Sequence, residues 1–272
     1  VAHDLNYVLT GIVSYPDFLL IKMPADSQYR EYVNAIKASG DRAVAIVQDL
    51  ITVARGVATA KEPLNINDLI DDYLNSPEYH QLMNHHPGVR LATDIDPDLF
   101  NIKGSQVHVR KVIMNLVANA TEAISGHGQV TVSTTNRYVD TPLKGYDDIK
   151  VGEYVILSIS DDGIGISAED LERVFEPFYT KKVMDRSGTG LGLAVVWNVL
   201  QDHNGYIDIT SHSDGTRFEL FFPITREKIS QKNLSVPITD LVGDGERILV
   251  VDDEENQRDI SCKMLDSLGY VS

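Results

Sequence analysis

Apolar positions in the first sixty residues repeat with helical spacing. In the second half of this region they alternate in steps of four and three, as in a coiled coil or a four-helix bundle. This series is Tyr29, Val33, Ile36, Gly40, Ala43, Val47, Leu50, Ala54 and Val57. A break at residues 23–27 predicts two helices, with Asp26 or Ser27 capping the second. A dimer of such hairpins would bury both apolar seams, and the alternative is a hairpin packed on the rest of the same chain.

From Pro63 onward the pattern changes to a mixture of helical and strand periodicity. The predicted strands cover residues 89–95, 129–135, 153–160, 206–211 and 216–223. The predicted helices cover residues 68–75, 104–125 and 190–203, with Asn67 or Asp68 as the cap of the first and a polar stretch at 76–88. This mixture predicts an α+β chain in which a helical hairpin precedes a two-layer α/β sandwich.

The last part of the chain has a different character. Residues 226–245 are polar and contain Pro237, Gly243 and Gly245, which is typical of a linker. Residues 247–254 read as a buried strand that ends in acids, and a helix is predicted at 255–268. We therefore divide the chain into segments 1–62, 63–225, 226–245 and 246–272. The abrupt helical start and the short final segment, too small to bury its own core, predict a piece of a longer protein.

The composition narrows the classes of function. The formal net charge of −16 argues against a general nucleic-acid binder, which needs a basic surface, and against docking on an anionic membrane. The single cysteine cannot form an intramolecular disulfide, and the sequence contains no long apolar run. We therefore expect a cytoplasmic segment with neither a nucleic-acid partner nor a membrane span.

The first helix carries a histidine beside an acid. An imidazole on a helix surface can accept a phosphoryl group if a neighbouring carboxylate takes its proton and steadies the positive charge. His3 and Asp4 provide this pair, and they gain meaning only if a nucleotide site follows in the chain.

Two further motifs supply the chemistry of such a site. Asn115 and Asn119 lie one turn apart on one face of the helix at 104–125, and amide oxygens can coordinate Mg²⁺. Asp161 ends a predicted strand, where its carboxylate could accept the exocyclic amine of adenine. Gly163 and Gly165 would let the backbone approach the ring.

A later pair of motifs has the character of a phosphate-binding loop. The stretch Phe175 to Lys182 combines anchoring aromatic residues with two lysines that could meet phosphate. The stretch Gly188 to Leu193 places three glycines at a predicted helix N-terminus, where backbone amides bind anions. Its spacing fits neither a P-loop nor a dinucleotide-binding fingerprint.

In this order, the motifs resemble the N box, first G box, F box and second G box of histidine kinases. These enzymes belong to the GHKL ATPase superfamily, together with gyrase, mismatch-repair ATPases and a large chaperone. The segment Gly215 to Leu220 resembles the family's last element, and the segment His3 to Asn6 resembles the H box, so the likeness covers residues 1–223.

The resemblance implies a role for each residue. His3 is the phosphoacceptor with Asp4 as base, Asn119 holds Mg²⁺ with help from Asn115, Asp161 reads adenine beside Thr216, and the second G box closes the ATP lid. The residues implied to contact the nucleotide are Asn115, Asn119, Asp161, Gly163, Gly165, Thr180, Lys182, Gly188, Thr189, Gly190, Leu191, Gly192 and Thr216. The implied cofactors are ATP and Mg²⁺, and the implied partners are a second copy of the chain and a response-regulator receiver domain.

Position 115 separates this chain from its hydrolytic relatives. Superfamily members that hydrolyse ATP carry a Glu four residues before the metal-binding Asn, whereas Asn115 cannot take a proton. This favours phosphoryl transfer to an imidazole. Two other functions stay open at this point: an ATP-driven conformational clamp of the same superfamily, and a non-catalytic dimeric scaffold.

Two remaining features refine the comparison with the family. Residues 247–272 resemble the start of a receiver domain, with Asp252 and Asp253 matching its acidic Mg²⁺ pocket, so the parent protein is expected to be a hybrid kinase. Four residues after the phosphoacceptor the family usually has Asn or Thr, which orients the water for dephosphorylating the partner. This chain has Tyr7 there, which predicts weak phosphatase activity.

Overall fold

The structure is a computed structural model that describes residues 2–55, 60–181, 189–229, 242–251 and 255–271. The side chains of residues 2–11, 54–55, 255–257, 260 and 267 lie outside this description. The chain divides into two compact units, Val1–Ile229 and Ser230–Ser272, and we treat each by itself.

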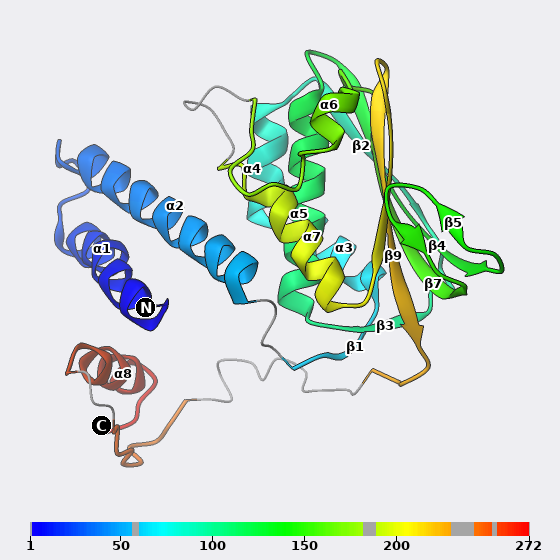
Figure 1. Cartoon of the computed structure of the whole chain (residues 1–272). Coiled ribbons are helices and arrows are strands. Elements are labelled where there is room, and N and C mark those ends of the chain that lie inside the picture. Colours follow the sequence, from blue (N-terminus) through cyan, green and yellow to red (C-terminus); the bar gives the residue numbers. More distant parts are fainter. Residues whose placement is uncertain (1, 56–59, 182–188, 230–241, 252–254, 272) are drawn as a thin grey trace. The chain divides into compact units, whose positions relative to one another are not determined.

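The first unit begins with a helical hairpin of α1 (Ala2–Lys22) and α2 (Arg30–Arg55), as the apolar periodicity predicts (Figure 1). Arg30 joins the two helices, because its Nη1 donates to the carbonyl oxygens of Leu20 at 2.9 Å and Met23 at 2.8 Å. These bonds satisfy acceptors that the end of α1 would otherwise leave free. Along the hairpin, Gly40 allows close contact, since an added Cβ would lie 3.1 Å from the Ile12 side chain.

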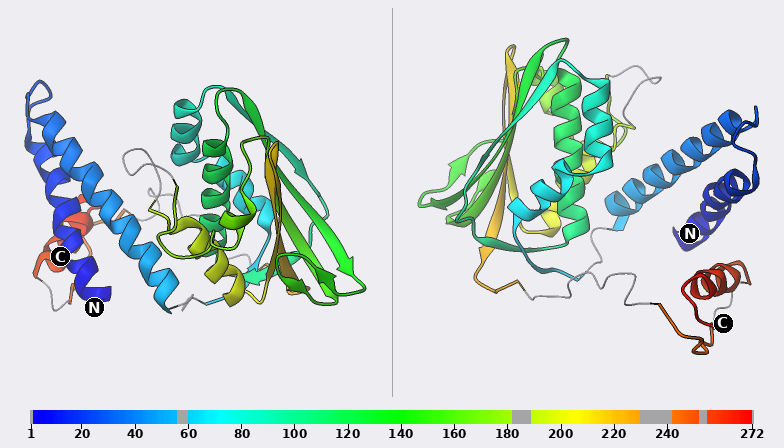
Figure 2. Two further views of the ribbon diagram at one scale, coloured as in Figure 1. Left: turned by 45° about the horizontal axis from the view of Figure 1, so that its top comes forward. Right: turned by 180° about the vertical axis from the view of Figure 1, so that it is seen from behind.

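The rest of the first unit is a sheet with helices on one face (Figures 1 and 2). The strands are β1 (Glu62–Leu64), β2 (Val89–Ile95), β3 (Asn101–Gly104), β4 (Gly128–Val139), β5 (Leu143–Lys144), β6 (Asp148–Ile149), β7 (Gly152–Asp161), β8 (Tyr206–His212) and β9 (Gly215–Thr225). The helices are α3 (Ile66–Leu74), α4 (Pro77–His85), α5 (Gln106–Ala123), α6 (Ala168–Leu171) and α7 (Gly192–Asp202).

Seven strands form the main sheet in the order β1-β3-β9-β7-β4-β2, with β8 paired to the other part of β9. The pair β2–β4 is parallel, and the remaining pairs of this sheet are antiparallel. The sheet and its helical layer confirm the predicted two-layer α/β sandwich.

Both faces of the central strand β7 are buried. Val155, Leu157 and Ile159 belong to the main hydrophobic core under the helices. Tyr154 and Ile156 belong to a smaller core on the opposite face. Successive side chains of a strand point to opposite faces, so this alternation builds two cores from one strand.

The smaller core is covered by the hairpin β5–β6, which also closes the free edge of β8. The backbone N–H of Asp147 donates to the Ile207 carbonyl at 3.1 Å, and the Ile207 N–H donates to Asp147 Oδ2 at 3.0 Å. The Tyr146 N–H donates to Asp208 Oδ1 at 2.9 Å. The backbone groups of Ile207 that would face solvent at the sheet edge are therefore paired.

A buried histidine ties the end of α7 to the start of α5. The His203 side chain is 5% exposed, its Nδ1 lies 2.6 Å from the Val199 carbonyl oxygen, and its Nε2 accepts the Ser105 N–H at 3.1 Å. A neutral ring that donates from Nδ1 and accepts at Nε2 satisfies both contacts. Gly104 is required beside it, because an added Cβ would lie 2.8 Å from the ring.

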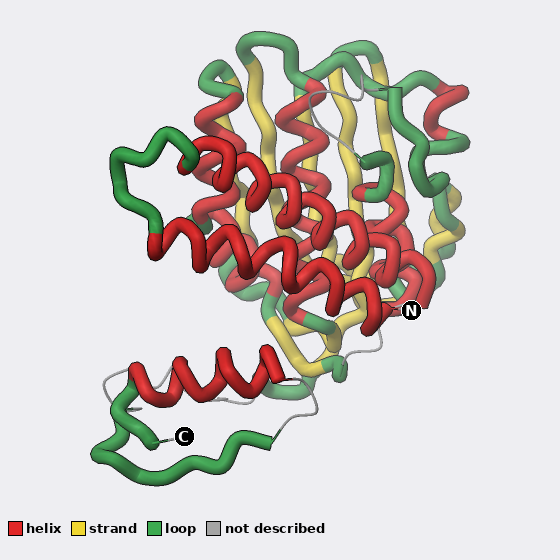
Figure 3. Tube along the Cα trace, turned by 90° about the vertical axis from the view of Figure 1, so that its left-hand side faces the viewer, coloured by secondary structure: helices red, strands yellow, loops and turns green. Residues whose placement is uncertain are grey.

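Several details differ from the sequence predictions. The short strands β1, β3, β5 and β6 were not predicted, and Asn65, rather than Asn67 or Asp68, caps α3. The polar stretch at 76–88 contains α4, which starts with Pro77 and is capped by Ser76, whose Oγ accepts the Tyr79 N–H at 3.3 Å. The strand predicted at 247–254 is wrong for its described residues, because only an isolated bridge between Arg247 and Val271 forms there. An apolar run becomes a strand only when a neighbouring strand pairs with it, and Figure 3 draws no strand in this unit.

In the second unit, helix α8 (Glu255–Ser267) confirms the helix predicted at 255–268. Leu249 and Val251 precede it and are 87% and 81% exposed. Among the described helices of the whole chain, none combines the length and the apolar character that crossing a bilayer requires.

Burial lowers the pKa of His203 below its ordinary value. As the pH is lowered from 6.5 to 5.5, the histidine takes up a proton in the unfolded chain but stays neutral in the folded chain. The free energy of unfolding therefore decreases over this window, by about 1 kcal/mol at most. We expect His203→Gln to show a shallower fall in the free energy of unfolding over this window. Chemical denaturation of the whole chain at several pH values measures it. The exposed His127→Gln should keep the wild-type slope, and equal slopes for His203→Gln would contradict the assignment.

Candidate functional site: polar residues and glycine motifs along helix α5

The two asparagines of the predicted metal motif lie at the margin of the buried face of α5. Ile113, Leu116 and Val117 fix this helix in the core with exposures of 1% or less, while Asn115 and Asn119 are half-buried. Asn115 Nδ2 donates to the Gly192 carbonyl oxygen at 3.0 Å, which leaves its Oδ1 available. Asn119 makes no hydrogen bond within the described part of the chain. Amide oxygens in this state match the oxygen ligands that Mg²⁺ takes.

The C-terminal end of α5 contacts the first glycine motif. The Ile164 N–H donates to the Ala123 carbonyl oxygen at 3.2 Å, and a Cβ added to Gly163 would lie 2.6 Å from that oxygen. From Asn115 to Ala123 the helix rises by about 12 Å. The two glycine motifs therefore contact the same helix at points separated by a distance suited to an extended nucleoside triphosphate.

Asp161 is the last residue of β7 and lies opposite Thr216 of β9 in the strand register. Its Oδ1 accepts the Gly163 N–H at 2.9 Å. Burial raises the pKa of the Asp161 carboxyl, and hydrogen bonds from the backbone of Gly163 and Thr216 oppose this effect. A half-buried carboxylate with remaining acceptor capacity suits recognition of a ring amine.

Sequence reasoning did not find Ser211, which supports this corner. Its Oγ accepts the Ile166 N–H at 2.7 Å and lies 2.9 Å from Thr216 Oγ1. Gly165 next to it has a φ of +71°, and an added Cβ would lie 1.7 Å from the His212 carbonyl oxygen. Only glycine fits this position, which explains the second glycine of the motif. A serine in an exposed-looking strand gives no sequence signal for such a role.

The second glycine motif opens α7, and its described part runs from Thr189 to Leu193. Gly190 has a φ of +69°, and its carbonyl oxygen accepts the Phe178 N–H at 2.9 Å. Leu191 is fully buried, and its N–H donates to Thr189 Oγ1 at 3.3 Å. Among the described residues, no side chain forms a capping hydrogen bond with the first amides of α7 itself. Uncapped amides at the N-terminus of a helix attract anions.

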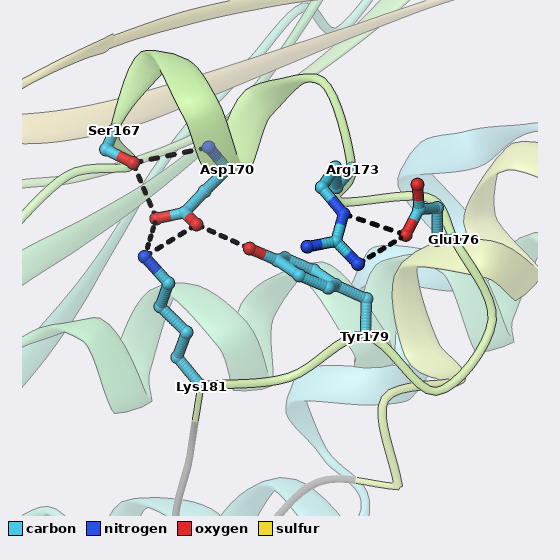
Figure 4. Close-up of polar contacts among 6 residues, drawn as sticks. All are labelled: Ser167, Asp170, Arg173, Glu176, Tyr179 and Lys181. Atoms are coloured by element: carbon cyan, nitrogen blue, oxygen red, sulfur yellow. Dashed lines mark hydrogen bonds and ion pairs between the residues drawn. The ribbon is translucent and has the colours of Figure 1, made fainter.

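The F box packs against α7 and the β5–β6 hairpin next to this motif. Phe175 packs on Trp197 of α7, with ring centroids 5.0 Å apart, and on Tyr146 of the β5–β6 hairpin at 5.2 Å. Tyr179 donates to Asp170 Oδ1 at 2.5 Å, and Lys181 lies 2.7 Å from the same carboxylate (Figure 4). The aromatic residues therefore anchor the loop, as predicted.

The structure brings most of the predicted residues to α5 and its neighbours, with Thr180 exposed at the end of the F box. Lys182 and Gly188 lie outside the described residues, as do Asp252 and Asp253. His3 and Asp4 lie in the first turns of α1, and their side chains are likewise not described. Direct contacts between these residues and a nucleotide stay predictions.

Comparisons with known proteins agree with this geometry. Residues 104–226 match the family described as "Histidine kinase-, DNA gyrase B-, and HSP90-like ATPase". Sensor kinase CckA of Brucella abortus (strain 2308) is 33% identical over 284 residues, covering 100% of this chain and 29% of CckA. Sporulation kinase A of Bacillus subtilis (strain 168) is 30% identical over 225 residues, covering 82% of this chain and 33% of that kinase. The chain thus spans about a third of the length of these relatives.

Two solved structures share the fold. Full-length ShkA, in complex with AMPPNP, has a TM-score of 0.64 at 22% identity, covering 99% of this chain and 53% of ShkA. The Acinetobacter baumannii histidine kinase AdeS has a TM-score of 0.53 at 19% identity, covering 83% of this chain and 100% of that chain.

Residues 104–226, which supply most of the sandwich, thus belong to the ATPase family of histidine kinases, DNA gyrase B and HSP90. The whole chain is similar to sensor kinases over the third of their length that it spans.

The raised pKa of Asp161 leads to a test that separates binding from folding. A carboxyl with a raised folded pKa loses stability as pH rises through that pKa, so the ionised Asp161 destabilises the fold at neutral pH. We expect Asp161→Asn to lower ATP affinity by at least about tenfold, since the charged acceptor becomes a neutral amide oxygen and the hydrogen bond to it weakens. Its melting temperature at pH 7 should equal or exceed that of the wild type.

Calorimetric titration with ATP and a thermal melt measure the two quantities. Asp94→Asn is the matched control, because Asp94 is an exposed strand carboxylate away from the pocket, and it should bind ATP as the wild type does. Unchanged ATP affinity in Asp161→Asn would rule out its role in adenine recognition.

Proposed function

We propose that this chain is an ATP-dependent protein-histidine kinase that phosphorylates its own His3 and passes the phosphoryl group to a receiver-domain aspartate. A His3 ring nitrogen attacks the γ-phosphorus, the bond from that phosphorus to the β,γ-bridging oxygen breaks, and ADP leaves. Asp4 takes or holds the proton of the other ring nitrogen and stabilises the imidazolium. The reaction therefore requires a nucleotide site and a helix-borne imidazole, and the sequence contains both.

The observation that carries this proposal is the amide at position 115. Asn115 bonds to Gly192 and has no group that can take a proton from water, so the pocket lacks a general base at the place where hydrolytic relatives have Glu. A pocket that binds ATP without activating water leaves the phosphoryl group for another nucleophile. His3 is the nucleophile that the sequence supplies.

Mg²⁺ fits the donor set of this pocket. Asn119 would hold it and Asn115 would assist, since both amide oxygens are available among the described contacts. When bound, the ion neutralises charge on the phosphates.

The proposal includes a homodimer, and the surface of the hairpin supports it. Large apolar side chains stay exposed on α1 and α2 although the two helices pack together. They include Ile12, Phe18, Leu19, Tyr32 and Ile36, with exposures between 40% and 67%. Several exposed apolar side chains on one helical hairpin are typical of an interaction site, and a second hairpin would complete a four-helix bundle.

The proposal also assigns residues 246–272 to the start of a receiver domain and the parent protein to the hybrid kinases. The similarity to CckA extends over this segment, and the exposed Leu249 and Val251 precede a helix as core residues of a first strand would. The receiver that accepts the phosphoryl group belongs either to the parent chain or to a separate regulator. The proposed function also places the whole given chain in the cytoplasm.

Incubation with γ-labelled ATP tests the central reaction. We expect label on the wild-type chain that is stable in base and lost in acid, because a phosphoramidate hydrolyses in acid. His3→Gln should carry no label while binding ATP as the wild type does, whereas His80→Gln, a histidine outside the pocket, should label normally. Label that persists in His3→Gln would refute the proposal, and ATP binding without any label would favour a scaffold or a clamp.

A second test concerns Tyr7. Because the tyrosine side chain is longer than the usual Asn or Thr, it should not place the water that dephosphorylates a receiver. We expect a phosphorylated receiver to survive several-fold longer with the wild-type kinase and ADP than with Tyr7→Asn. The autophosphorylation rate of the two proteins serves as the control and should agree. Equal receiver lifetimes would reject this role of Tyr7.

A further inference from the structure

The last described residues of the F box hold a carboxylate that the nucleotide chemistry does not use. Asp170, on α6, accepts hydrogen bonds from Ser167 Oγ at 2.6 Å, Tyr179 Oη at 2.5 Å and Lys181 Nζ at 2.7 Å (Figure 4). Its side chain is only 14% exposed, whereas Lys181 is 68% exposed. Because three donors bind this partly shielded carboxylate, its position is held more firmly than that of a carboxylate in an isolated surface ion pair.

The ring of Tyr179 is held from a second side. The Arg173 guanidinium lies over it at 4.3 Å from the centroid, and Glu176 Oε2 in turn accepts from Arg173 Nε at 3.0 Å. Residues 167–181 therefore form one interlocked unit in which Asp170 contacts both Tyr179 and Lys181.

This unit contacts the second glycine motif directly. Phe178, next to Tyr179, has a φ of +68° and donates its N–H to the Gly190 carbonyl oxygen. A Cβ added to Gly190 would lie 2.5 Å from the backbone of Phe178, so the two segments touch without intervening side chains. Two residues further on, the Gly192 carbonyl oxygen accepts from Asn115. A continuous line of contacts thus leads from Asp170 through the F box to the polar edge of α5.

The two lysines of the F box can now be distinguished. The sequence left open whether Lys181 and Lys182 both meet phosphate. Lys181 already has its ammonium group on Asp170, in a contact whose partner is anchored by two further donors. A lysine in this state does not reach a ligand without breaking that contact.

We propose that Asp170 and Lys181 are positioning residues of the nucleotide site, which hold the Phe178–Gly190 contact and leave phosphate binding to other groups. This inference rests on the proposed function, because it assigns a role within the same ATP site. The Asp170–Lys181 pair acts on the backbone that presents the site rather than on the nucleotide. It therefore sets how tightly ATP binds, and it has no part in the transfer step.

Lys181, with contributions from Ser167 and Tyr179, holds the pKa of the Asp170 carboxyl well below its usual range. The pair stays ionised from weakly acidic to neutral pH. Its effect on ATP binding should therefore be constant between pH 6 and 8, where a titrating histidine would give a slope.

The test is a double-mutant cycle in the full chain with Asp170→Asn, Lys181→Met and the double variant. Calorimetry gives the dissociation constant for Mg-ATP, and labelling of His3 gives the KM for ATP and kcat. We expect each single variant to raise the dissociation constant and KM by about threefold, as for one partly shielded ion pair, with kcat within about twofold of wild type. The double variant should be no weaker than either single one, because the two residues act through one contact.

Two controls separate positioning from general destabilisation. Lys103→Met breaks a surface ion pair of similar length, with Glu227 at 2.8 Å and Lys103 52% exposed, and it should leave ATP binding unchanged. Lys181→Arg keeps the pairing with Asp170 and should restore wild-type binding.

Several outcomes would overturn the inference. If Lys181→Met weakens ATP binding by the same factor in the Asp170→Asn background, Lys181 contacts the phosphates itself. If none of the variants changes the dissociation constant, the pair has no role at the site. Calorimetry measures ATP binding independently of phosphoryl transfer. If the wild-type chain bound ATP but left His3 unlabelled, the kinase activity would be refuted, and the dissociation constants of the variants would still test the role of the Asp170–Lys181 pair.

Discussion

Burial of one face of α5 against the sheet is the interaction on which the nucleotide pocket depends. Ile113, Leu116 and Val117 are almost fully enclosed, and removing a side chain of this size from a core costs about 2–5 kcal/mol. That burial fixes the rotation of the helix about its axis. The rotation places Asn115 and Asn119 at the polar margin, where Asn115 reaches Gly192, and the C-terminal carbonyl of Ala123 contacts the Gly163 segment. The single helix α5 thus sets the spacing of the residues that we propose as metal ligand, adenine-binding residue and phosphate-binding loop.

The ionised Asp161 lowers the folding stability of this domain at neutral pH. A carboxylate that is partly desolvated and supported by backbone amides is poised to pair with a ligand, and without the ligand its charge is incompletely solvated. Gly165 and Gly190 add to this, because both require left-handed backbone so that neighbouring strands and loops can close around the site. In the proposed role of Asp161, a bound nucleotide would relieve the first of these costs and so link ligand binding to folding.

The sequence predicted the elements whose periodicity is long and regular. The helix α5 and the strands β7 and β9 were found because their apolar positions repeat over ten or more residues. The short helix α4 was missed, although Ser76 and Pro77 are a helix-start signal, because its apolar residues are few. The strand predicted at 247–254 was wrong because an apolar run shows no pairing partner.

The candidate site, like the fold, was predicted only in part. Glycines, acids and amides at family spacing were recognised as motifs, and the structure brings the described ones to α5 and its neighbouring segments. The supports of the motifs could not be predicted: Ser211 under Thr216, Tyr146 on Phe175, and Phe178 against Gly190 are contacts between segments distant in sequence. No local pattern encodes such contacts, because they depend on how the finished sheet and helices meet.

The hairpin β5–β6 has a consequence for how copies of this chain can associate. An unpaired outer strand is a template on which another molecule can add a strand, and this is a common route to aggregation. Here Asp147 forms hydrogen bonds with both the N–H and the carbonyl oxygen of Ile207, and the Asp208 carboxylate accepts the Tyr146 N–H. The outer edge of β8 therefore has few free backbone groups with which another strand could pair. Self-association through the β8 edge is thereby disfavoured. The proposed dimer of helical hairpins would then bring two ATP-binding domains to a high local concentration without pairing them through β8.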